Sequence, residues 1–365
     1  MNLWQIMNSE KMYIQQRRLI EKIRKSAARY LGRSKTIYVW DRTPYYREMW
    51  KKAAQRRNMQ FVELANDIWE LRDNNGKCFT RINNCYVELD NPVTLHIAGH
   101  KAVTYALLSD AGLPVPANLS FTLDSLDKLA EFVRNQPGPL VVKPASNTGS
   151  GLGITTHLNT YRGCVKAAAL ASLYGPELLV EQFVAGEVYR LLFVGAEFVS
   201  GVRRNGLRID GDGKSTLSEL IRAVNPDLVA NWRNDLDLQT TTRLQGFDES
   251  TVLAAGQNVL VKSAPDTYED NIEIRTVYTE DVTSELCSDI IEEARQAARV
   301  LRSELCGIDL ILLDPKRSLR DGNGIIGEVN TTPGMHHHYN LPGYDPQNDA
   351  ADVVLEHIRR KCKNG

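Results

Sequence analysis

The chain has 365 residues, more than one ordinary core holds, and this length predicts two or three lobes. Its 44 lysines and arginines nearly cancel its 45 aspartates and glutamates, so the bulk charge predicts no nucleic-acid partner and no anionic membrane surface. Six scattered cysteines without CxxC pairs, no signal-peptide pattern and no apolar segment of about 20 residues predict a cytoplasmic protein with free thiols.

The first part of the chain alternates helices and strands. Apolar residues recur at helical spacing among basic ones over Leu3–Leu31, which predicts a helix packed on its own domain, rather than one bound to a membrane or a partner. A strand over Thr36–Trp40, a helix over Pro44–Arg57 and a strand over Gln60–Ala65 are expected next. This alternation predicts a small α/β lobe over residues 1–95.

A lysine at the end of a strand precedes a glycine-rich loop. The helix predicted over Lys101–Ala111 ends at a glycine, and a second helix over Ser125–Arg134 leads into the apolar strand Leu140–Pro144. This strand contains Lys143, and glycines 149, 151 and 153 then let backbone amides approach a ligand closely. The pattern favours a phosphate grip, with a mobile surface loop as the alternative.

Two arginines are placed on a predicted hairpin in the middle of the chain. A helix over Tyr161–Tyr174 and a strand over Glu177–Val184 precede it, and Val188–Val194 then pairs with Glu197–Arg203. Arg190 and Arg203 on these strands suit oxyanions, because the guanidinium donates hydrogen bonds in a fixed planar geometry. Further on, Thr216 and Glu219 form a capping box that begins a helix over Leu217–Val224.

The last third of the chain contains a second predicted hairpin. It follows a strand over Ala254–Lys262 and an amphipathic helix over Ser284–Ser303, and it spans Gly307–Gly334. Three adjacent histidines, His336 to His338, come next, and a helix over Ala350–Lys361 ends the chain. Neighbours in an extended segment point to opposite sides and cannot all bind one ion, so the histidines are expected to form a pocket wall or a solvated loop.

Three polar side chains interrupt the apolar strands of the second hairpin. Asp309 lies within the first strand, while Glu328 and Asn330 are two residues apart on the second and point to one face. Buried carboxylates that face each other repel, and a divalent cation removes the repulsion. Two carboxylates and an amide offer only oxygen atoms as metal ligands, which predicts Mg²⁺, with Mn²⁺ as an alternative. Ordinary charges on a solvated loop would not explain why these residues interrupt apolar strands.

The order of these features resembles the ATP-grasp superfamily, and within it the ATP-grasp portion of cyanophycin synthetases. The resemblance covers about residues 96–345 and is carried by Val141-Val142-Lys143-Pro144, Val180-Glu181, Gly186-Glu187, Arg190 to Gly195, Gly211-Asp212-Gly213, Cys306-Gly307-Ile308-Asp309 and Glu328 to Gly334. It implies an α/β (α+β) ATP-grasp fold with a lid subdomain over residues 96–187 and a metal-binding subdomain over residues 188–365. D-alanine:D-alanine ligases, which the chain resembles in outline, carry an arginine where this chain has Gly307.

The resemblance also implies roles for single residues. Lys101 and Lys143 would neutralise nucleotide phosphates, and Asp309, Glu328 and Asn330 would hold the metal ion. The loop with Ser150, Gly151 and Gly153 would close over the phosphates, the segment Glu181, Gln182, Phe183 and Val184 would receive adenine, and Glu187 would bind ribose. Arg203, together with Arg190, would stabilise the oxyanion.

The implied activity is that of an ADP-forming, ATP-dependent carboxylate–amine ligase. It would act through an acylphosphate on amino acid or small peptide substrates, whose identity the sequence does not give. A phosphotransferase that stops at a phosphorylated product would use the same residues, and a nucleotide-binding module without catalysis is a third interpretation. A homodimer formed through the N-terminal lobe is one arrangement that the sequence leaves open.

Overall fold

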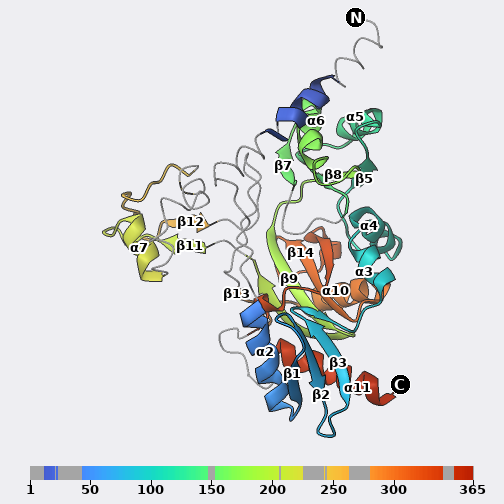
Figure 1. Ribbon diagram of the computed structural model, residues 1–365. Coiled ribbons are helices and arrows are strands. Elements are labelled where there is room, and N and C mark those ends of the chain that lie inside the picture. Colours follow the sequence, from blue (N-terminus) through green and yellow to red (C-terminus); the bar gives the residue numbers. More distant parts are fainter. Residues whose placement is uncertain are drawn as a thin grey trace, which may run out of the picture.

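Antiparallel sheets follow one another along the molecule, with a small module at one side (Figure 1). The computed structural model describes residues 12–20, 22–23, 43–146, 153–204, 207–224, 242, 245–262, 280–339 and 349–364. Residues 12–20 and 22–23 are helical, as predicted, whereas the strand predicted over Thr36–Trp40 lies outside the described residues. No helix in the described part of the chain is both long and apolar enough to cross a membrane.

The first sheet is an antiparallel meander in the order β1-β2-β3-β4. Its strands are β1 (Gln60–Glu63), β2 (Ile68–Arg72), β3 (Cys78–Asn83) and β4 (Tyr86–Val87). Asn74-Asn75-Gly76 and Asn83-Asn84 lie at two of its hairpin turns, where Gly76 and Asn84 have φ of 79° and 50°. The predicted alternation of helices and strands named no element between Ala65 and residue 95, and so did not include β2, β3 and β4.

The second sheet has the order β5-β8-β6-β7. Its strands are β5 (Asn118–Phe121), β6 (Leu140–Pro144), β7 (Thr155–Leu158) and β8 (Leu178–Gln182), and the helices α5 (Leu126–Asn135) and α6 (Tyr161–Ala171) pack on it. Their shared core contains Leu129, Val142 and Val180, each fully buried. The predicted helix over Tyr161–Tyr174 ends three residues early, in a turn before Gly175.

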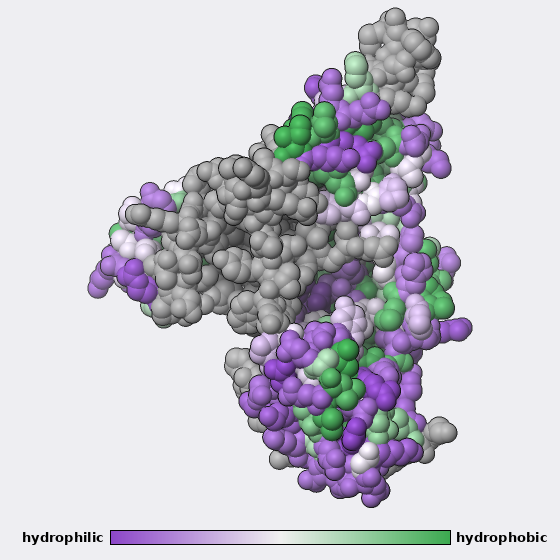
Figure 2. All heavy atoms as spheres, viewed as in Figure 1, coloured by the Kyte–Doolittle hydropathy of each residue, from purple (hydrophilic) through white to green (hydrophobic). Residues whose placement is uncertain are grey.

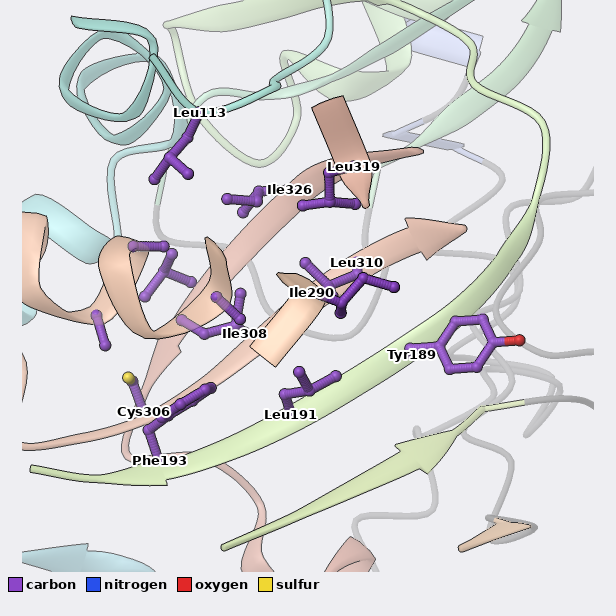
Figure 3. Close-up of a cluster of buried hydrophobic side chains, with 14 of the residues drawn as sticks. Leu113, Tyr189, Leu191, Phe193, Ile290, Cys306, Ile308, Leu310, Leu319 and Ile326 are labelled. Carbon is purple, nitrogen blue, oxygen red and sulfur yellow. The ribbon is translucent and has the colours of Figure 1, made fainter. Parts of the chain in front are cut away.

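The central sheet has the order β13-β10-β9-β14-β15. Its strands are β9 (Glu187–Val194), β10 (Glu197–Arg203), β13 (Glu280–Asp281), β14 (Leu305–Leu312) and β15 (Gly324–Thr331). Both predicted hairpins are confirmed, since β9 pairs with β10 and β14 pairs with β15. The helix α10 (Ser288–Leu301) covers one face, where Leu191, Phe193, Ile308 and Leu310 form the core shown in Figure 3.

Short helices and a side module complete the chain. The helices α3 (Pro92–Ala98) and α4 (Lys101–Asp110) connect the first and second sheets, and the 3₁₀ turns are η2 (Leu319–Asp321) and η3 (Met335–His337). The module consists of β11 (Leu207–Asp210), β12 (Asn258–Lys262) and α7 (Leu217–Val224). The predicted capping box is confirmed, because Thr216 N donates to Glu219 Oε2 over 2.8 Å and Glu219 N donates back to Thr216 Oγ1 over 3.3 Å.

Two helices that are far apart in the sequence, α2 (Thr43–Arg56) and α11 (Ala350–Asn364), pack against each other. They share a core with the first sheet and with the end of the central sheet. This core contains Trp50, Trp69, Leu192 and Leu355, each fully buried. On the face shown in Figure 2, hydrophobic side chains reach the surface in small groups among hydrophilic ones.

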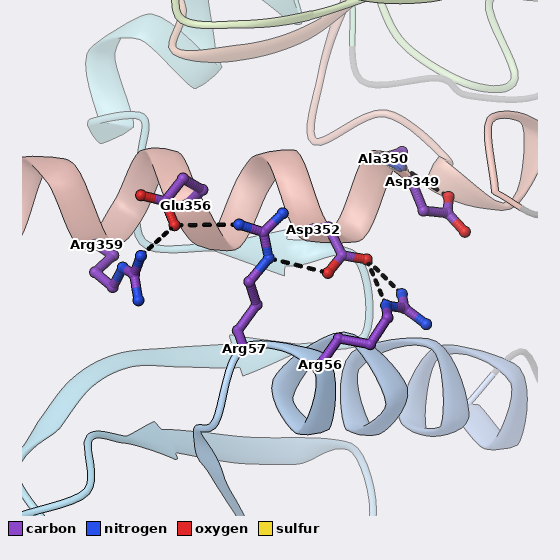
Figure 4. Close-up of polar contacts among 7 residues, drawn as sticks. All are labelled: Arg56, Arg57, Asp349, Ala350, Asp352, Glu356 and Arg359. Carbon is purple, nitrogen blue, oxygen red and sulfur yellow. Dashed lines mark hydrogen bonds and ion pairs between the residues drawn. The ribbon is translucent and has the colours of Figure 1, made fainter. Parts of the chain in front are cut away.

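A buried aspartate joins these two helices through arginines (Figure 4). The Asp352 carboxylate, 1% exposed, accepts from Nε of Arg56 over 3.0 Å and from Nε of Arg57 over 3.1 Å. Breaking a buried pair leaves the partner charges without compensation, so Asp352→Asn should lower the free energy of unfolding by about 3 kcal/mol in urea denaturation. Glu356→Gln is the control, because its carboxylate is 28% exposed and contacts Arg57 from the rim. Equal losses in the two variants would contradict the prediction.

Candidate active site

The central sheet sends polar side chains to the face that α10 does not cover. On β9, Tyr189 and Leu191 belong to the core under α10, so Arg190 between them projects to the opposite face. On β14, Ile308 and Leu310 belong to the same core, and Asp309 therefore also projects away from it. Arg190 and Asp309 stand directly opposite each other in the β9–β14 register, which brings their side chains together.

A β-bulge turns the second predicted metal ligand onto the same face. In the β14–β15 register Glu328 stands opposite Asp309 and Ile326 stands opposite Leu310, so Gly327 is the extra residue. Ile326 and Val329 are both buried in the core under α10. Without the extra residue, Glu328 would share a face with Ile326; the bulge places it beside Asp309 instead.

The remaining predicted ligand follows the regular alternation. Asn330 stands opposite Gly307 and two residues after Glu328, so it lies on the same face. The structure therefore brings the side chains of Asp309, Glu328 and Asn330 to one face of the central sheet.

Each of the two carboxylates is paired with cations. Asp309 binds Arg190 in a two-point contact, with Nε–Oδ1 of 2.5 Å and Nη2–Oδ2 of 2.6 Å, and Arg204 Nη1 lies 3.8 Å from Oδ2. Glu328 Oε1 lies 3.0 Å from Lys101 Nζ. The lysine is the first residue of α4, and its side chain is 9% exposed. These pairs relieve the repulsion that two adjacent carboxylates would otherwise produce.

The pairing keeps the groups charged. Burial raises the pKa of the Glu328 carboxyl, but the attraction of Lys101 and a hydrogen bond to it outweigh burial and lower that pKa to about 2. Burial lowers the pKa of the Lys101 ammonium, and the opposing attraction of Glu328 leaves it above its usual value. Near neutral pH the site therefore holds an ionised acid and an ionised base side by side.

A second ion pair between a lysine and a glutamate lies where the second sheet meets the central sheet. Lys143 of β6 and Glu181 of β8 are both buried, and Nζ–Oε1 is 2.6 Å. The Tyr105 hydroxyl lies between them, accepting from Lys143 Nζ over 3.3 Å, with Glu181 Oε2 at 3.1 Å and the Gly327 carbonyl at 2.6 Å. Burial, followed by the charges of Glu181 and Glu328, raises the pKa of Tyr105 well above its ordinary value, so the phenol keeps its proton.

The other residues predicted to bind nucleotide are placed as follows. Gln182 ends β8, Phe183 and Val184 follow it, and the Phe183 ring lies 4.1 Å from the His157 ring between centroids. Gly153 has φ of 77°, and a Cβ there would meet Tyr174 Cδ2 at 2.8 Å, so the position requires glycine. Ser150 and Gly151 lie outside the described residues.

Two predicted residues are not brought together with the others. Arg203 stands opposite Tyr189 in the β9–β10 register, on the other face from Arg190. Its guanidinium binds Glu280 over 2.7 Å and Glu187 over 3.2 Å, and Glu187 also accepts from the Tyr189 hydroxyl over 3.1 Å. The next residue, Arg204, is the one that reaches Asp309.

The structure adds Tyr105 and Arg204 to the residues that the sequence predicted for the site. Tyr105 follows Lys101 by four positions and therefore lies on the same face of α4, which is a spacing that the sequence displays. Arg204 lies an even number of residues after Ser200, and Ser200 stands opposite Leu192 on the face that carries Arg190. Strand alternation counted from this register places Arg204, and not Arg203, on the face of Arg190.

The histidine segment is a 3₁₀ turn, not the extended segment that the sequence suggested. His337 and His338 are buried, and His338 Nδ1 lies 2.8 Å from Ser200 Oγ. The prediction of a solvated loop is wrong for these two residues, because their rings pack into the interior. The hydroxyl of Tyr46 lies 2.8 Å from His336 Nδ1, so the N-terminal lobe contacts the same segment.

Both buried histidines should make stability depend on pH. Burial, then the positive charges of nearby histidines and arginines, lowers the pKa of His337 and His338 well below 6.5. Below pH 6.5 the unfolded chain therefore binds protons that the folded chain refuses, and the free energy of unfolding should fall by about 1.4 kcal/mol per pH unit for each histidine. Urea denaturation between pH 7.5 and pH 5.5 (roughly the histidine range) measures this slope.

A matched pair of variants assigns the slope. His338→Asn keeps a polar atom near the Nδ1 position for Ser200 and removes one titrating group. The slope of its unfolding free energy against pH should therefore fall by the contribution of one histidine, about 1.4 kcal/mol per pH unit. His157→Asn, at an exposed position, should keep the slope of the parent chain. An unchanged slope in His338→Asn would contradict the assignment.

The polar face fits a hard divalent cation. Among the described residues, no group of three or more His, Cys, Asp or Glu side chains could hold a metal ion, and the candidate donors on this face are two carboxylates and one amide. Nδ2 of Asn330 is buried without a hydrogen-bond partner in the described structure; this NH₂ group is a hydrogen-bond donor, so Oδ1 is the atom of this side chain that would bind a cation. Carboxylate and amide oxygens are donors that Mg²⁺ accepts.

The glycine at position 307 makes room for Arg190. A Cβ built on Gly307 would lie 3.1 Å from Cδ of Arg190 and 3.1 Å from Cβ of Pro333. The arginine of the adjacent strand β9 thus fills the space beside Gly307.

The chain is similar in sequence to two groups of synthetases. It is 29% identical over 275 residues to a cyanophycin synthetase of Synechocystis sp., and this match covers 71% of this chain and 30% of that protein. It is 28% identical over 277 residues to a glutathione biosynthesis bifunctional protein GshAB of Listeria monocytogenes, and this match covers 74% of this chain and 35% of that protein. The chain thus spans about a third of the length of these relatives. No family model matches it.

The structure is similar to that of a bifunctional glutathione synthetase from Pasteurella multocida. The TM-score is 0.59 at 20% sequence identity, and the match covers 86% of this chain and 43% of that one. The chain has the ATP-grasp fold that its sequence predicts, and its relatives in sequence are ATP-grasp ligases.

Proposed function

We propose that this chain, a relative of the ATP-grasp ligases, is an ADP-forming, ATP-dependent carboxylate–amine ligase that acts on amino acid or small peptide substrates. The observation that carries the proposal is the meeting of Lys101 and Lys143 with the carboxylates Glu328 and Glu181, where the second sheet meets the central sheet. The cyanophycin synthetases and GshAB proteins, which it resembles, form products from amino acids or peptides, and this supports the substrate class. The phosphate-binding, metal-binding and domain assignments below belong to the same proposal.

The ion pairs of the site are suited to exchange partners with a nucleotide. The cations Lys101, Lys143, Arg190 and Arg204 face the carboxylates Glu181, Asp309 and Glu328. Phosphate oxygens can replace Glu328 as the partner of Lys101, and an anionic substrate group can replace Asp309 as the partner of Arg190 and Arg204, which would release Asp309 and Glu328 for a cation. With Asn330, these residues would hold Mg²⁺ or Mn²⁺, which neutralises charge on the phosphates during transfer.

The chain's own residues position the reactants and neutralise charge. An oxygen of the substrate carboxylate attacks the γ-phosphorus, and the bond to the bridging oxygen of ADP breaks. The amine nitrogen then attacks the acyl carbon, phosphate leaves, and the nitrogen loses a proton. Lys101 and Lys143 hold the phosphates, while Arg190 and Arg204 lie beside Asp309, where they can stabilise the oxyanion of the second step.

The remaining assignments concern the base, the ribose and the lid. Glu181 to Val184, the segment that ends β8 and leads to β9, would receive adenine, and Glu187 would bind ribose after exchanging its contact with Arg203. Gly153 would belong to the loop that excludes water, which protects an acylphosphate from hydrolysis. The proposal keeps the subdomains expected from the sequence, a lid subdomain over residues 96–187 and a metal-binding subdomain over residues 188–365.

The test is a product assay with a panel of amino acids and dipeptides. The protein is incubated with ATP and Mg²⁺, ADP is measured enzymatically, and products are identified by mass. The proposal expects ADP and an amide in equal amounts, only when both a carboxylate and an amine are present. A stable phosphorylated compound would identify a phosphotransferase instead, and ADP release independent of any amine, with no amide, would refute the ligase.

A further inference from the structure

The hydroxyl of Tyr105 lies at the junction of the two sheets that form the candidate site. The side chain is 1% exposed, and its ring packs with Ala145 and Leu179. The hydroxyl contacts both residues of the Lys143–Glu181 pair on the second sheet and the carbonyl of Gly327 on β15. Tyr105 is therefore a buried link between the Lys143–Glu181 ion pair and β15, the strand that carries Glu328.

The direction of the hydrogen bonds can be deduced from the number of protons. A phenol has one proton to donate, and the Gly327 carbonyl at 2.6 Å is closer than Glu181 Oε2 at 3.1 Å. Lys143 Nζ, which has only protons to donate, donates to the phenolic oxygen over 3.3 Å. The result is a chain from the Lys143 ammonium through the Tyr105 hydroxyl to the Gly327 carbonyl, in which each bond polarises the next.

The carbonyl at the end of this chain belongs to the bulge. Gly327 is the extra residue that turns Glu328 onto the face of Asp309. Its carbonyl carbon is bonded to the nitrogen of Glu328, so a hydrogen bond that fixes this peptide group also fixes the start of the Glu328 side chain. Bulges beside active sites commonly aim a side chain in this way.

We propose that Tyr105 is a positioning residue that couples Lys143 to the metal-binding strand by holding the Gly327 peptide. This inference rests on the proposed function, because it assigns Glu328 to the metal and Lys143 to the phosphates. When a phosphate takes Lys143 away from Glu181, the hydroxyl of Tyr105 keeps the bulge in place. Loss of the hydroxyl should therefore raise the Mg²⁺ concentration that nucleotide binding requires, and should not lower only the stability of the fold.

The test compares Tyr105→Phe with Thr104→Val. The first variant keeps the packed ring and removes the hydroxyl. The second removes a neighbouring buried hydroxyl on α4 that donates to the Ile97 carbonyl over 3.0 Å, away from the site. Binding of the β,γ-imido analogue of ATP is measured by calorimetry at increasing Mg²⁺, well below the melting temperature of each variant. The Mg²⁺ concentration for half-maximal binding should rise roughly 10-fold or more in Tyr105→Phe, and less than about 2-fold in Thr104→Val.

Each outcome has a separate meaning. If the parent chain does not bind the analogue with Mg²⁺, the proposed function fails and the inference fails with it. If the parent chain binds and Tyr105→Phe requires the same Mg²⁺ concentration, the positioning role is refuted and the proposed function stands. An equal rise in both variants would show a general effect of α4 and would also refute the role. Thermal unfolding of both variants checks that their losses of stability are comparable.

Discussion

Glu328→Gln should lower ligase turnover roughly 1,000-fold or more while leaving nucleotide binding measurable. The substitution keeps the size of the side chain and removes the negative charge, which the structure places opposite Asp309 and 3.0 Å from Lys101. A hard cation loses a charged ligand, whereas Lys101 and Lys143 remain to bind phosphates. Turnover is measured as ADP release at saturating ATP, and binding is measured by calorimetry with the β,γ-imido analogue.

A second glutamate provides the control for this substitution. Glu304 contacts His357 at 2.8 Å and Lys361 at 3.1 Å, so Glu304→Gln also removes a carboxylate from ion pairs, but beside α11 rather than at the site. Its turnover should stay within about 2-fold of the parent chain, since surface pairs contribute little. Full turnover in Glu328→Gln would show that the metal ion is bound elsewhere.

Arg190→Met should lower the free energy of unfolding by about 3–5 kcal/mol and abolish turnover. The side chains of Arg190 and Asp309 are 9% and 12% exposed, so removing the arginine leaves a buried carboxylate without its two-point partner. Arg204 at 3.8 Å offers only a single, longer contact. Stability is measured by urea denaturation.

The double variant Arg190→Met/Asp309→Asn separates the cost of the lone charge from the worth of the pair. Removing both charges leaves no buried ion, so the double variant should be clearly more stable than Arg190→Met while remaining inactive. Strictly additive losses would mean that the two side chains do not interact in solution, and would contradict the contact between them.

The sequence could predict that three polar side chains of the second hairpin share one face. Asp309, Glu328 and Asn330 interrupt apolar strands, and strand alternation carries that information directly. The bulge at Gly327 does not appear in the alternation of one strand, because it is a property of the register with β14. Glu328 was nevertheless placed correctly relative to Asn330, because the bulge lies before both of them.

Other contacts depend on tertiary structure that a single sequence does not show. The choice between Arg203 and Arg204 needs the register of β10 against β9, and the sequence offers both arginines side by side. Tyr105 looks like a core residue of α4, and its role depends on β6, β8 and β15 meeting around it. The burial of His337 and His338 rules out the solvated loop, one of the two alternatives for this segment, which forms a 3₁₀ turn and not the extended chain that the sequence suggested.

The packing of α2 against α11 affects how the protein is made. Arg57 and Asp352 are 295 residues apart in the chain, yet the core around Trp50 and Trp69 includes Ala351 and Leu355. During synthesis, α2 and the first sheet leave the ribosome long before α11, so their apolar side is covered only after α11 has followed. Contacts of such long sequence separation slow folding, so α2 and the first sheet are where a nascent chain would most need a chaperone.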